Sequence, residues 1–293
     1  MKKSKVNALI TLLDDPDAAI YDQVKDELLS IGEDAIPYLE SAWEDSFPVG
    51  RFSNILVLQS RIENLIHKIQ LEANSNHLKN WVKYDSINLL NGAVVIAKYQ
   101  YPDLDRDKIV NQISMIRNDI WLELDDSLTA YEKIRLVNRI IYDIHGFSGN
   151  TNNFHAPQNS FINDVLGNKK GNPLSLSLIY LAICQALGLP LKGINLPKHF
   201  ILGYMKSPNE VDFYINPFSR GAIFSHRDIN DFLVQLKIEP NKSYYAPCSN
   251  YDMILRVLIN LRYSYEKLGY KNKIEEIEEM IYNLNLGHQE DCE

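Results

Sequence analysis

The chain of 293 residues is poor in cysteine, carries no excess of positive charge and has no long apolar run. Its three cysteines, Cys184, Cys248 and Cys292, lie far apart and form no Cys-x-x-Cys pattern, which argues against a disulfide framework and a thiolate zinc site. A net charge of -8 argues against general nucleic-acid binding, which needs a basic face. These features are typical of a protein of the reducing cytoplasm that has no nucleic-acid partner.

No stretch of the sequence is long and apolar enough to cross a bilayer. The longest uncharged stretch, 173–190, would be about 22 Å long as a helix between its flanking glycines, whereas a bilayer core is roughly 30 Å thick. The lysines at the N-terminus are followed by no apolar run, so we expect no signal peptide. We therefore expect a cytoplasmic protein without a membrane partner, in which this stretch forms a core helix.

Most of the chain has the apolar periodicity of helices, within an ordinary globular composition of 45% hydrophobic and 23% charged residues. Two short helices with a tight join in the first 45 or so residues resemble one unit of a helical-repeat protein. Longer helices are predicted at 54–73, 85–100, 106–124 and 130–146. Near the C-terminus, the pattern predicts a helical hairpin made of 251–269 and 272–287.

After Pro190 the pattern changes to the period of two that is typical of strands. "HFILGYM" and "VDFYINPF" are separated by the turn sequence "KSPNE", which predicts an antiparallel hairpin centred between residues 208 and 209. In that register His199 faces Phe218, and Asn216 faces Ile201. His199 and Asn216 would then share one sheet face, roughly 7–8 Å apart at Cβ. An asparagine at that distance can orient a histidine ring, as in a catalytic triad. A short helix is predicted at 228–237.

The stretch "GNPLSLSLIYLAICQALGLPLKGINLPKHFIL" (171–202) has the arrangement of a thiol-enzyme site: a glycine turn, a helix, a second turn and a histidine. Asn172 is predicted to cap the helix, with Pro173 at its first position. In thiol hydrolases the nucleophile stands at such a helix start, because the helix dipole favours the thiolate. The residue at that place here is Pro173, which cannot act as a nucleophile.

Several stretches of the sequence carry a family resemblance when they are taken together. They are "NSFINDVL" (159–166), "KGNPLSLSLIYLAICQALGLPLKGINLPKHFIL" (170–202), "INPFSRG" (215–221), "AKYQYPDLD" (97–105) and "SNYDMILRVLINLR" (249–262). They resemble the transglutaminase-like core, and specifically its SirB branch, found in many bacteria and in an F-box protein family. The resemblance implies an α+β, mainly helical protein. Its papain-like core would pack a nucleophile-bearing helix on an antiparallel sheet, flanked by N- and C-terminal helices.

The resemblance also assigns places to the catalytic residues of the wider superfamily. By spacing to "GLP" (188–190), the superfamily cysteine aligns with Pro173, its histidine with His199 and its aspartate with Asn216. The resemblance therefore implies that the histidine is retained, that the acid is replaced by an amide and that the nucleophile is absent. Loss of the cysteine is typical of the SirB branch.

Other residues could in principle replace the missing nucleophile. Ser175 and Ser177 lie in the first turns of the predicted helix, so a triad of Ser175, His199 and Asn216 is chemically conceivable, although such serines commonly cap backbone N–H groups. Cys184 would lie about 16 Å along the helix from Pro173 and is expected to be a buried structural cysteine. His199 is either a structural hydrogen-bonding residue or a ligand-binding one. The candidate cleft residues are Asn159, Asn163, Asn172, Pro173, Ser175, Ser177, His199 and Asn216.

We expect three regions: a helical N-terminal region (1–148), a transglutaminase-like core (149–240) and a C-terminal helical hairpin packed on the core (241–293). The favoured function is a non-catalytic binding or regulatory module, a pseudoenzyme whose helical flanks could hold a protein partner. One alternative is a weak Ser-His-Asn hydrolase or peptidase, and another is a structural assembly protein with a vestigial cleft. No cofactor or metal is expected, because no carboxylate or cysteine cluster has the spacing of metal ligands.

Overall fold

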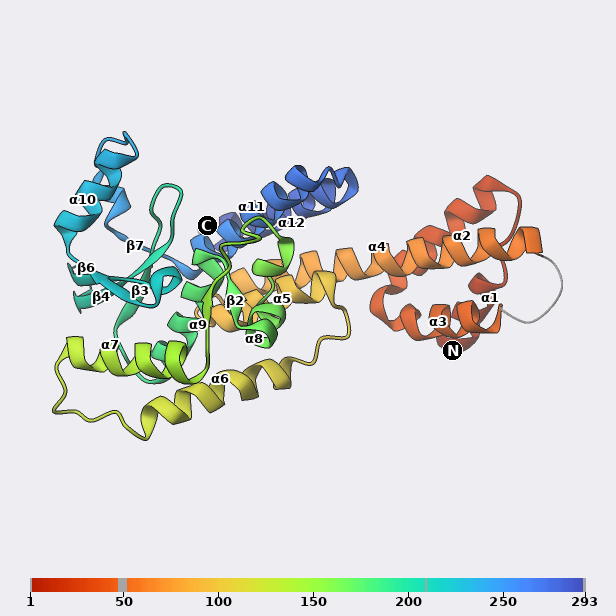
Figure 1. Ribbon diagram of the computed structural model, residues 1–293. Helices are drawn as coiled ribbons and strands as arrows, with labels where there is room; N and C mark the ends of the chain where they lie inside the picture. Colours follow the sequence, from red (N-terminus) through yellow and green to blue (C-terminus); the bar gives the residue numbers. More distant parts are fainter. Residues whose placement is uncertain (1, 47–51, 209, 292–293) are drawn as a thin grey trace. The chain divides into compact units, whose positions relative to one another are not determined.

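The computed structural model describes residues 2–46, 52–208 and 210–291, and the chain forms two compact units, Met1–His77 and Leu78–Glu293. The fold is mainly helical, with a five-stranded antiparallel sheet in the second unit (Figure 1). The predicted class, mainly helical with an antiparallel sheet, is therefore confirmed. The predicted three-region division, with boundaries at 148/149 and 240/241, stays a prediction.

The first unit is built from short helices and the beginning of a long one. They are α1 (Lys2–Ile10), α2 (Ala18–Ile31), α3 (Ile36–Asp45) and the first part of α4 (Phe52–Tyr84). The carboxylate of Asp17 accepts the Ala19 N–H and so caps α2. The core of this unit consists of Val6, Leu13, Val24, Leu28, Ala35, Leu39, Ile62, Leu65 and Ile69. The short helices expected in the first 45 residues are present, but α4 is longer than the predicted 54–73.

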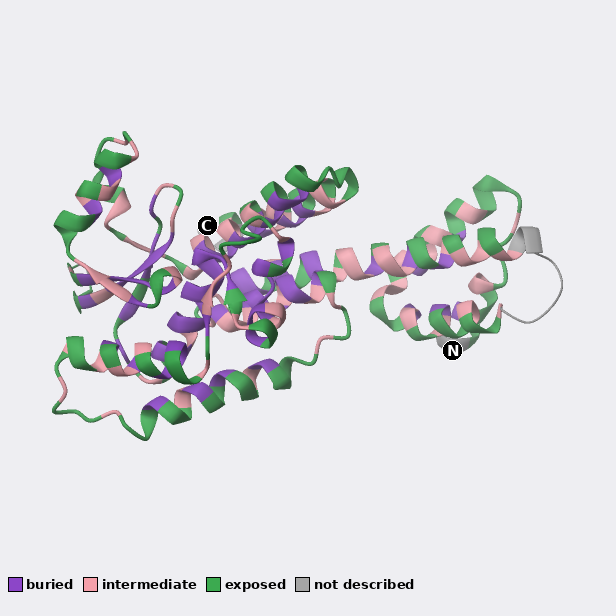
Figure 2. Ribbon diagram, viewed as in Figure 1, coloured by how far each residue is buried: buried purple, intermediate pink, exposed green. Residues whose placement is uncertain are grey.

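The second unit places helices around one buried helix. The helices before the sheet are α5 (Leu89–Gln100), α6 (Arg106–Trp121), α7 (Ala130–Asn138), α8 (Ile162–Asn168) and α9 (Pro173–Ala186). Asn88, Asp105 and Thr129 cap α5, α6 and α7 through their side-chain oxygens. After α7 the chain makes a π-helical segment, Arg139–Ile144, which the periodicity did not indicate. Because α5, α6 and α8 pack against α9, that helix is buried along most of its length (Figure 2).

The sheet has the strand order β6-β5-β4-β3-β7. Its strands are β3 (Leu191–Ile194), β4 (Ile201–Ser207), β5 (Glu210–Asn216), β6 (Ala222–Phe224) and β7 (Pro247–Cys248). Leu202 pairs with Ile215 and Gly203 with Tyr214, which is the register predicted for the hairpin. The predicted turn centre includes Asn209, which lies outside the described residues.

The prediction that His199 lies on a strand is wrong, because β4 begins only at Ile201. The preceding Lys198 has a φ of 60°, in the left-handed region that interrupts an extended chain. After β6, α10 (His226–Gln235) packs its apolar face on the sheet through Ile229 and Leu233. The predicted helix at 228–237 is thus present, although it starts two residues earlier.

Two further features place the site. A two-residue parallel pair, β1 (Ser148–Gly149) with β2 (Lys170–Gly171), ties the loop that follows β1 to the start of α9. The C-terminal part of the second unit contains α11 (Asn250–Leu268) and α12 (Lys271–Asp291), joined at Gly269, whose φ is 76°. Helix α11 packs on α5 and α9. No helix within the described part of the chain has the length and apolarity that a membrane span requires.

Candidate functional site

The start of α9 is fixed by a reciprocal cap. The Asn172 Oδ1 accepts the backbone N–H of Ser175 at 2.9 Å, and the Ser175 Oγ accepts the backbone N–H of Asn172 at 3.0 Å. Pro173 occupies the first turn, where its missing N–H removes no helical hydrogen bond. The predicted cap is confirmed, and Asn172 also donates from Nδ2 to the Ser160 Oγ at 3.1 Å.

The two serines of α9 are both engaged with the helix backbone. The Ser175 hydroxyl donates to the Asn172 carbonyl at 3.3 Å, and the Ser177 hydroxyl donates to the Pro173 carbonyl at 2.7 Å. Both residues are buried, with exposed fractions of 5% and 0%. A side chain at Gly171 would meet the Ser175 Oγ at 2.6 Å, so Ser175 is tightly enclosed. The expected capping role of Ser175 is therefore confirmed, and neither hydroxyl forms a hydrogen bond with His199.

His199 lies just before β4, between two cavities. Burial lowers the pKa of its imidazole most strongly; the Asn216 side chain acts in the opposite direction, and Arg256 lowers the pKa further. Its Nε2 atom is buried and has no hydrogen-bond partner among the described residues. The ring packs edge-on against Phe218, with 6.3 Å between the ring centroids. The neutral imidazole is therefore the favoured form.

Asn216 shares with His199 the lining of a small cavity of about 220 Å³, so the structure brings the two predicted residues together. The Asn216 Oδ1 accepts the backbone N–H groups of Phe218 and Ser219 at 3.1 and 3.3 Å, and its Nδ2 donates to the Ser219 Oγ at 3.1 Å. The amide is thus engaged by the turn after β5, and it influences the His199 pKa without forming a well-aligned hydrogen bond to the ring.

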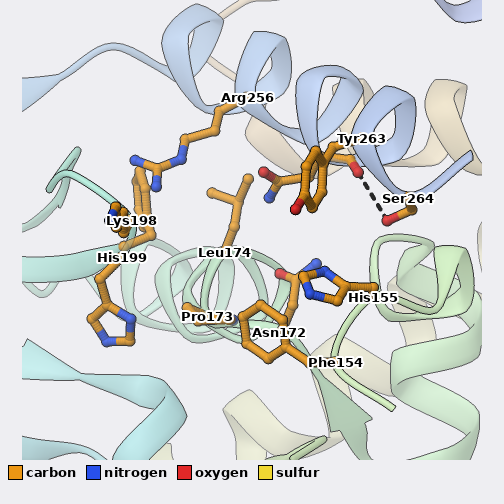
Figure 3. A pocket seen from close by; sticks show the side chains of 12 residues that line it. Phe154, His155, Asn172, Pro173, Leu174, Lys198, His199, Arg256, Tyr263 and Ser264 are labelled. Atoms are coloured by element: carbon orange, nitrogen blue, oxygen red, sulfur yellow. Dashed lines mark hydrogen bonds between the residues drawn. The ribbon is translucent and has the colours of Figure 1, made fainter. Parts of the chain in front are cut away.

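A cavity of about 410 Å³, here called the α9 cavity, opens beside the start of α9 (Figure 3). The described residues that line it are Phe154, His155, Asn172, Pro173, Leu174, Lys198, His199, Phe200, Arg256, Asn260, Tyr263 and Ser264. They come from the loop after β1, the start of α9, the segment before β4 and one face of α11. Arg256 and Tyr263 project from α11 on one side, with Pro173 and Leu174 of α9 on the other (Figure 3).

Some of the predicted cleft residues line a cavity and the others do not. Asn172, Pro173 and His199 line the α9 cavity, and Asn216 lines the small cavity behind His199. The four other predicted cleft residues, Asn159, Asn163, Ser175 and Ser177, are not among the lining residues of these two cavities.

Asn159 nevertheless shapes the cavity from behind. It is 2% exposed, and its Nδ2 donates to the carbonyls of Asn153 and Phe154 at 2.6 and 3.1 Å. These bonds hold the loop that carries Phe154 into the cavity wall. Asn163 instead donates to Asp164 at 3.2 Å, and its Oδ1 is buried without a partner among the described residues.

Sequence reasoning missed the residues that α11 contributes to the α9 cavity. Arg256, Asn260, Tyr263 and Ser264 are separated by four, three and one residues, a spacing that places them on one helical face. That spacing was the available signal. It could not reveal which face of α11 meets α9, because the packing joins segments far apart in the sequence.

The site offers little to a metal ion. Across residues 2–46, 52–208 and 210–291, no group of three or more His, Cys, Asp or Glu side chains is arranged to hold one. Cys184 lies toward the other end of α9, fully buried, and burial raises the pKa of its thiol well above the usual range.

Comparison with known proteins places this arrangement in a family context. The family described as Transglutaminase-like superfamily matches residues 107–259. A UPF0162 protein of Xylella fastidiosa is 31% identical over 118 residues, which cover 40% of this chain and 42% of that protein. A UPF0162 protein of Vibrio cholerae is 30% identical over 151 residues, or 52% and 55% of the two chains.

The similarity extends beyond bacteria. F-box only protein 21 of Homo sapiens is 33% identical over 91 residues, which cover 29% of this chain and 14% of that protein. The chain therefore spans 42% to 55% of the bacterial relatives named above and a smaller share of the human one. No solved structure is significantly similar to the chain.

Proposed function

The chain belongs to the transglutaminase-like superfamily, and on that premise we propose that it is a non-catalytic member, a binding module that holds a ligand beside the start of α9. We assign it to the SirB branch with a papain-like core, in which α9 takes the place of the nucleophile-bearing helix. His199 and Asn216 take the places of the superfamily histidine and acid. Pro173 takes the place of the cysteine.

The observation that carries the proposal is the state of the helix start. Pro173 has no nucleophilic atom, and the candidate replacement, the hydroxyl of Ser175, is enclosed in the reciprocal cap with Asn172. An active triad needs its nucleophile within about 2.6–3.2 Å of the histidine in a competent state. Ser175 would have to leave its cap to reach His199, which would expose unsatisfied backbone groups at the start of a buried helix.

The α9 cavity supports binding rather than a purely structural role. A vestigial cleft would be expected to be filled by side chains, whereas this cavity has about 410 Å³ of space, within the range of small-molecule sites. Its walls combine aromatic side chains with a few convergent polar groups, including Arg256, Lys198 and Asn260. That composition is typical of sites that orient a ligand.

One observation favours the hydrolase alternative. The His199 Nε2 is buried without a partner within the described residues, and a free imidazole nitrogen is what a general base requires. A hydrolase that uses Ser175, His199 and Asn216 is therefore the second candidate, and a measurement of turnover decides between the binding module and the hydrolase.

The first prediction concerns turnover. The parent protein should hydrolyse a nitrophenyl ester, a peptide amide and a glutamine amide no faster than background, and His199→Ala and Ser175→Ala should leave these rates unchanged. His199→Ala should lower stability by about 1–3 kcal/mol, since packing against Phe218 and Phe232 is lost. Melting temperature and turnover would be measured on the same samples.

Ser177→Ala is the matched control, because Ser177 is a buried serine one half-turn along that donates only to the Pro173 carbonyl. Turnover in the parent that disappears in His199→Ala and Ser175→Ala but persists in Ser177→Ala, with all variants folded, would establish the hydrolase and overturn the binding-module proposal.

A further inference from the structure

The α9 cavity has a charge that differs from that of the whole chain. The sequence contains 38 acidic and 30 basic residues. The described residues that line the cavity nevertheless include Lys198 and Arg256, and none of them is an aspartate or a glutamate. An acidic protein has therefore gathered cations, without carboxylates, around an open space, which is the charge distribution that suits an anion.

Arg256 is the central cation of this cavity. It projects from α11 and is partly buried; its Nη1 donates to the Leu196 carbonyl at 3.0 Å and to the Asn195 Oδ1. Its guanidinium lies 5.6 Å from the centre of the Phe200 ring. Burial lowers the pKa of Arg256, and no carboxylate is among the groups that act on it. A guanidinium has five N–H donors, and the hydrogen bonds of Arg256 to the described residues use only Nη1, so the donors on Nε and Nη2 are available to a ligand.

Another arginine of the same helix shows the contrast. Arg262, six residues further along α11, pairs with Glu278 at 3.0 Å on the exposed side of the helical hairpin. Both residues are arginines of α11. Arg256 lines the α9 cavity and pairs with no carboxylate of the described residues, whereas Arg262 pairs with Glu278. The pair provides a test variant and a matched control.

Lys198 supplies the second positive charge. Its backbone has a φ of 60°, a conformation that costs free energy for a residue other than glycine and that often occurs at binding sites. Figure 3 shows the Lys198 side chain and the Arg256 guanidinium on the same side of the cavity. Lys198 forms no ion pair with any carboxylate of the described residues. The start of α9, with its positive helix dipole, borders the same space.

The surroundings favour a ligand with a flat apolar part. Phe154, His155 and Tyr263 form an aromatic wall, in which the His155 and Tyr263 rings meet edge-on at 5.4 Å between centroids. A second cavity of about 450 Å³ shares His155 with the α9 cavity, and its described lining includes Lys267 and Lys273, of which Lys273 pairs with Glu276 at 3.1 Å. The small cavity behind His199 has Asp228 in its lining, so the α9 cavity differs from it in having no carboxylate among its described lining residues.

We propose that the α9 cavity binds the oxyanion of a small ligand, a carboxylate or a phosphate monoester, with Arg256 as its anchor and Lys198 as a second cation. The inference rests on the proposed function, because it assigns a ligand class to the same cleft. Arginine suits this role since its planar guanidinium forms paired hydrogen bonds with either kind of oxyanion. The aromatic wall then packs against the body of the ligand.

The second prediction is tested with three probes that have the same aromatic body: benzoate, phenyl phosphate and the neutral benzamide. Each is titrated into the full chain, and Kd is measured from NMR chemical shifts. We expect at least one anion to bind about tenfold or more tightly than benzamide, since only the anion gains charge-assisted hydrogen bonds. Arg256→Gln should weaken anion binding by about tenfold, and Lys198→Gln by a smaller factor. Arg262→Gln should leave Kd unchanged.

The outcomes separate the possible explanations. Preference between benzoate and phenyl phosphate identifies the kind of oxyanion. No binding of either anion, equal binding of benzamide, or an unchanged Kd in folded Arg256→Gln overturns the inference. If Arg256→Gln does not fold, the comparison of probes and the exposed Lys198→Gln variant decide. If the protein binds neither anion and shows no turnover, only the anion-binding inference is overturned. If it shows turnover, the non-catalytic function is overturned, whether or not anions bind.

Discussion

At the scale of single residues, His199 is the residue whose environment in the structure departs furthest from the one that the sequence predicts. The sequence presents it as the base of a triad, yet its Nε2 is buried without a partner among the described residues and Asn216 is engaged by the turn that follows it. Burial is the largest influence on its pKa and lowers it below the ordinary value of 6.5. The folded protein therefore favours the neutral ring, and His199 contributes to the pH dependence of stability.

The third prediction follows from the lowered pKa of His199. Because the folded state binds the His199 proton less tightly than the unfolded chain, it binds fewer protons at pH values just below 6.5. The contribution of the neutral ring is therefore fully present above the unfolded pKa of about 6.5 and is lost as the pH falls below it. The melting temperature should fall less steeply on acidification in His199→Gln than in the parent.

Thermal unfolding at a series of pH values between about 7.5 and 5.5 provides the measurement. His226→Gln serves as a control at an exposed histidine, whose ring stacks on Tyr245 at 4.2 Å between centroids, and it should retain the slope of the parent. Parallel curves for the parent and His199→Gln would show that His199 contributes nothing to the pH dependence of stability.

At the scale of elements, α9 organises the second unit. It is buried from Pro173 to Cys184 apart from Ala182, because helices α5, α6, α8 and α11 and strands of the sheet pack against it. A helix enclosed in this way can hold its first turn rigidly, and the reciprocal cap of Asn172 and Ser175 fixes the edge of the α9 cavity. The geometry of the site therefore depends on the stability of α9.

The fourth prediction tests the burial of α9 through its thiol. Cys184 is 0% exposed, and burial keeps the thiol protonated by raising its pKa. Mild iodoacetamide treatment of the native protein should leave Cys184 unmodified, whereas the same treatment in urea should alkylate it, as measured by peptide mass spectrometry. Rapid, selective alkylation of Cys184 in the native protein would mean that this face of α9 is not covered.

At the scale of the whole molecule, the second compact unit begins well before the predicted core at residue 149. It starts at Leu78, and helices α5 and α6 within it pack against α8 and α9. Ile96, Ile109 and Ile113 are among the buried residues that these two helices contribute. Apolar faces of this kind need a partner surface, so we expect the core to need α5 and α6 in order to fold.

The fifth prediction compares two fragments. Residues 78–293 should fold cooperatively, because they contain a complete compact unit. Residues 150–293 should be insoluble or partly molten, since the apolar surfaces of α8 and α9 lose the cover of α5 and α6. Near-ultraviolet circular dichroism and thermal unfolding distinguish the two states. A monomeric 150–293 fragment with a sharp transition would show that the core folds without these helices.

Local features were determined by the sequence alone. The cap of α9 by Asn172 follows from residue types within one helical turn, and the register of β4 with β5 follows from alternating side chains around a short turn. The helical hairpin at the C-terminus closes at Gly269 because glycine adopts a positive φ without cost. Each of these depends on neighbours close in sequence, whose patterns can be read directly.

Tertiary structure decided the rest of the site. His199 lies off the strand because Lys198 adopts a left-handed conformation that no periodicity indicates. The apolar periodicity likewise indicated neither the π-helical segment after α7 nor the full length of α4. Arg256 and Pro173 line the same cavity only because α11 packs on α9, since more than eighty residues separate the two in the sequence. A local pattern fixes which side chains share a helical face, but the packing of distant elements fixes what that face contacts.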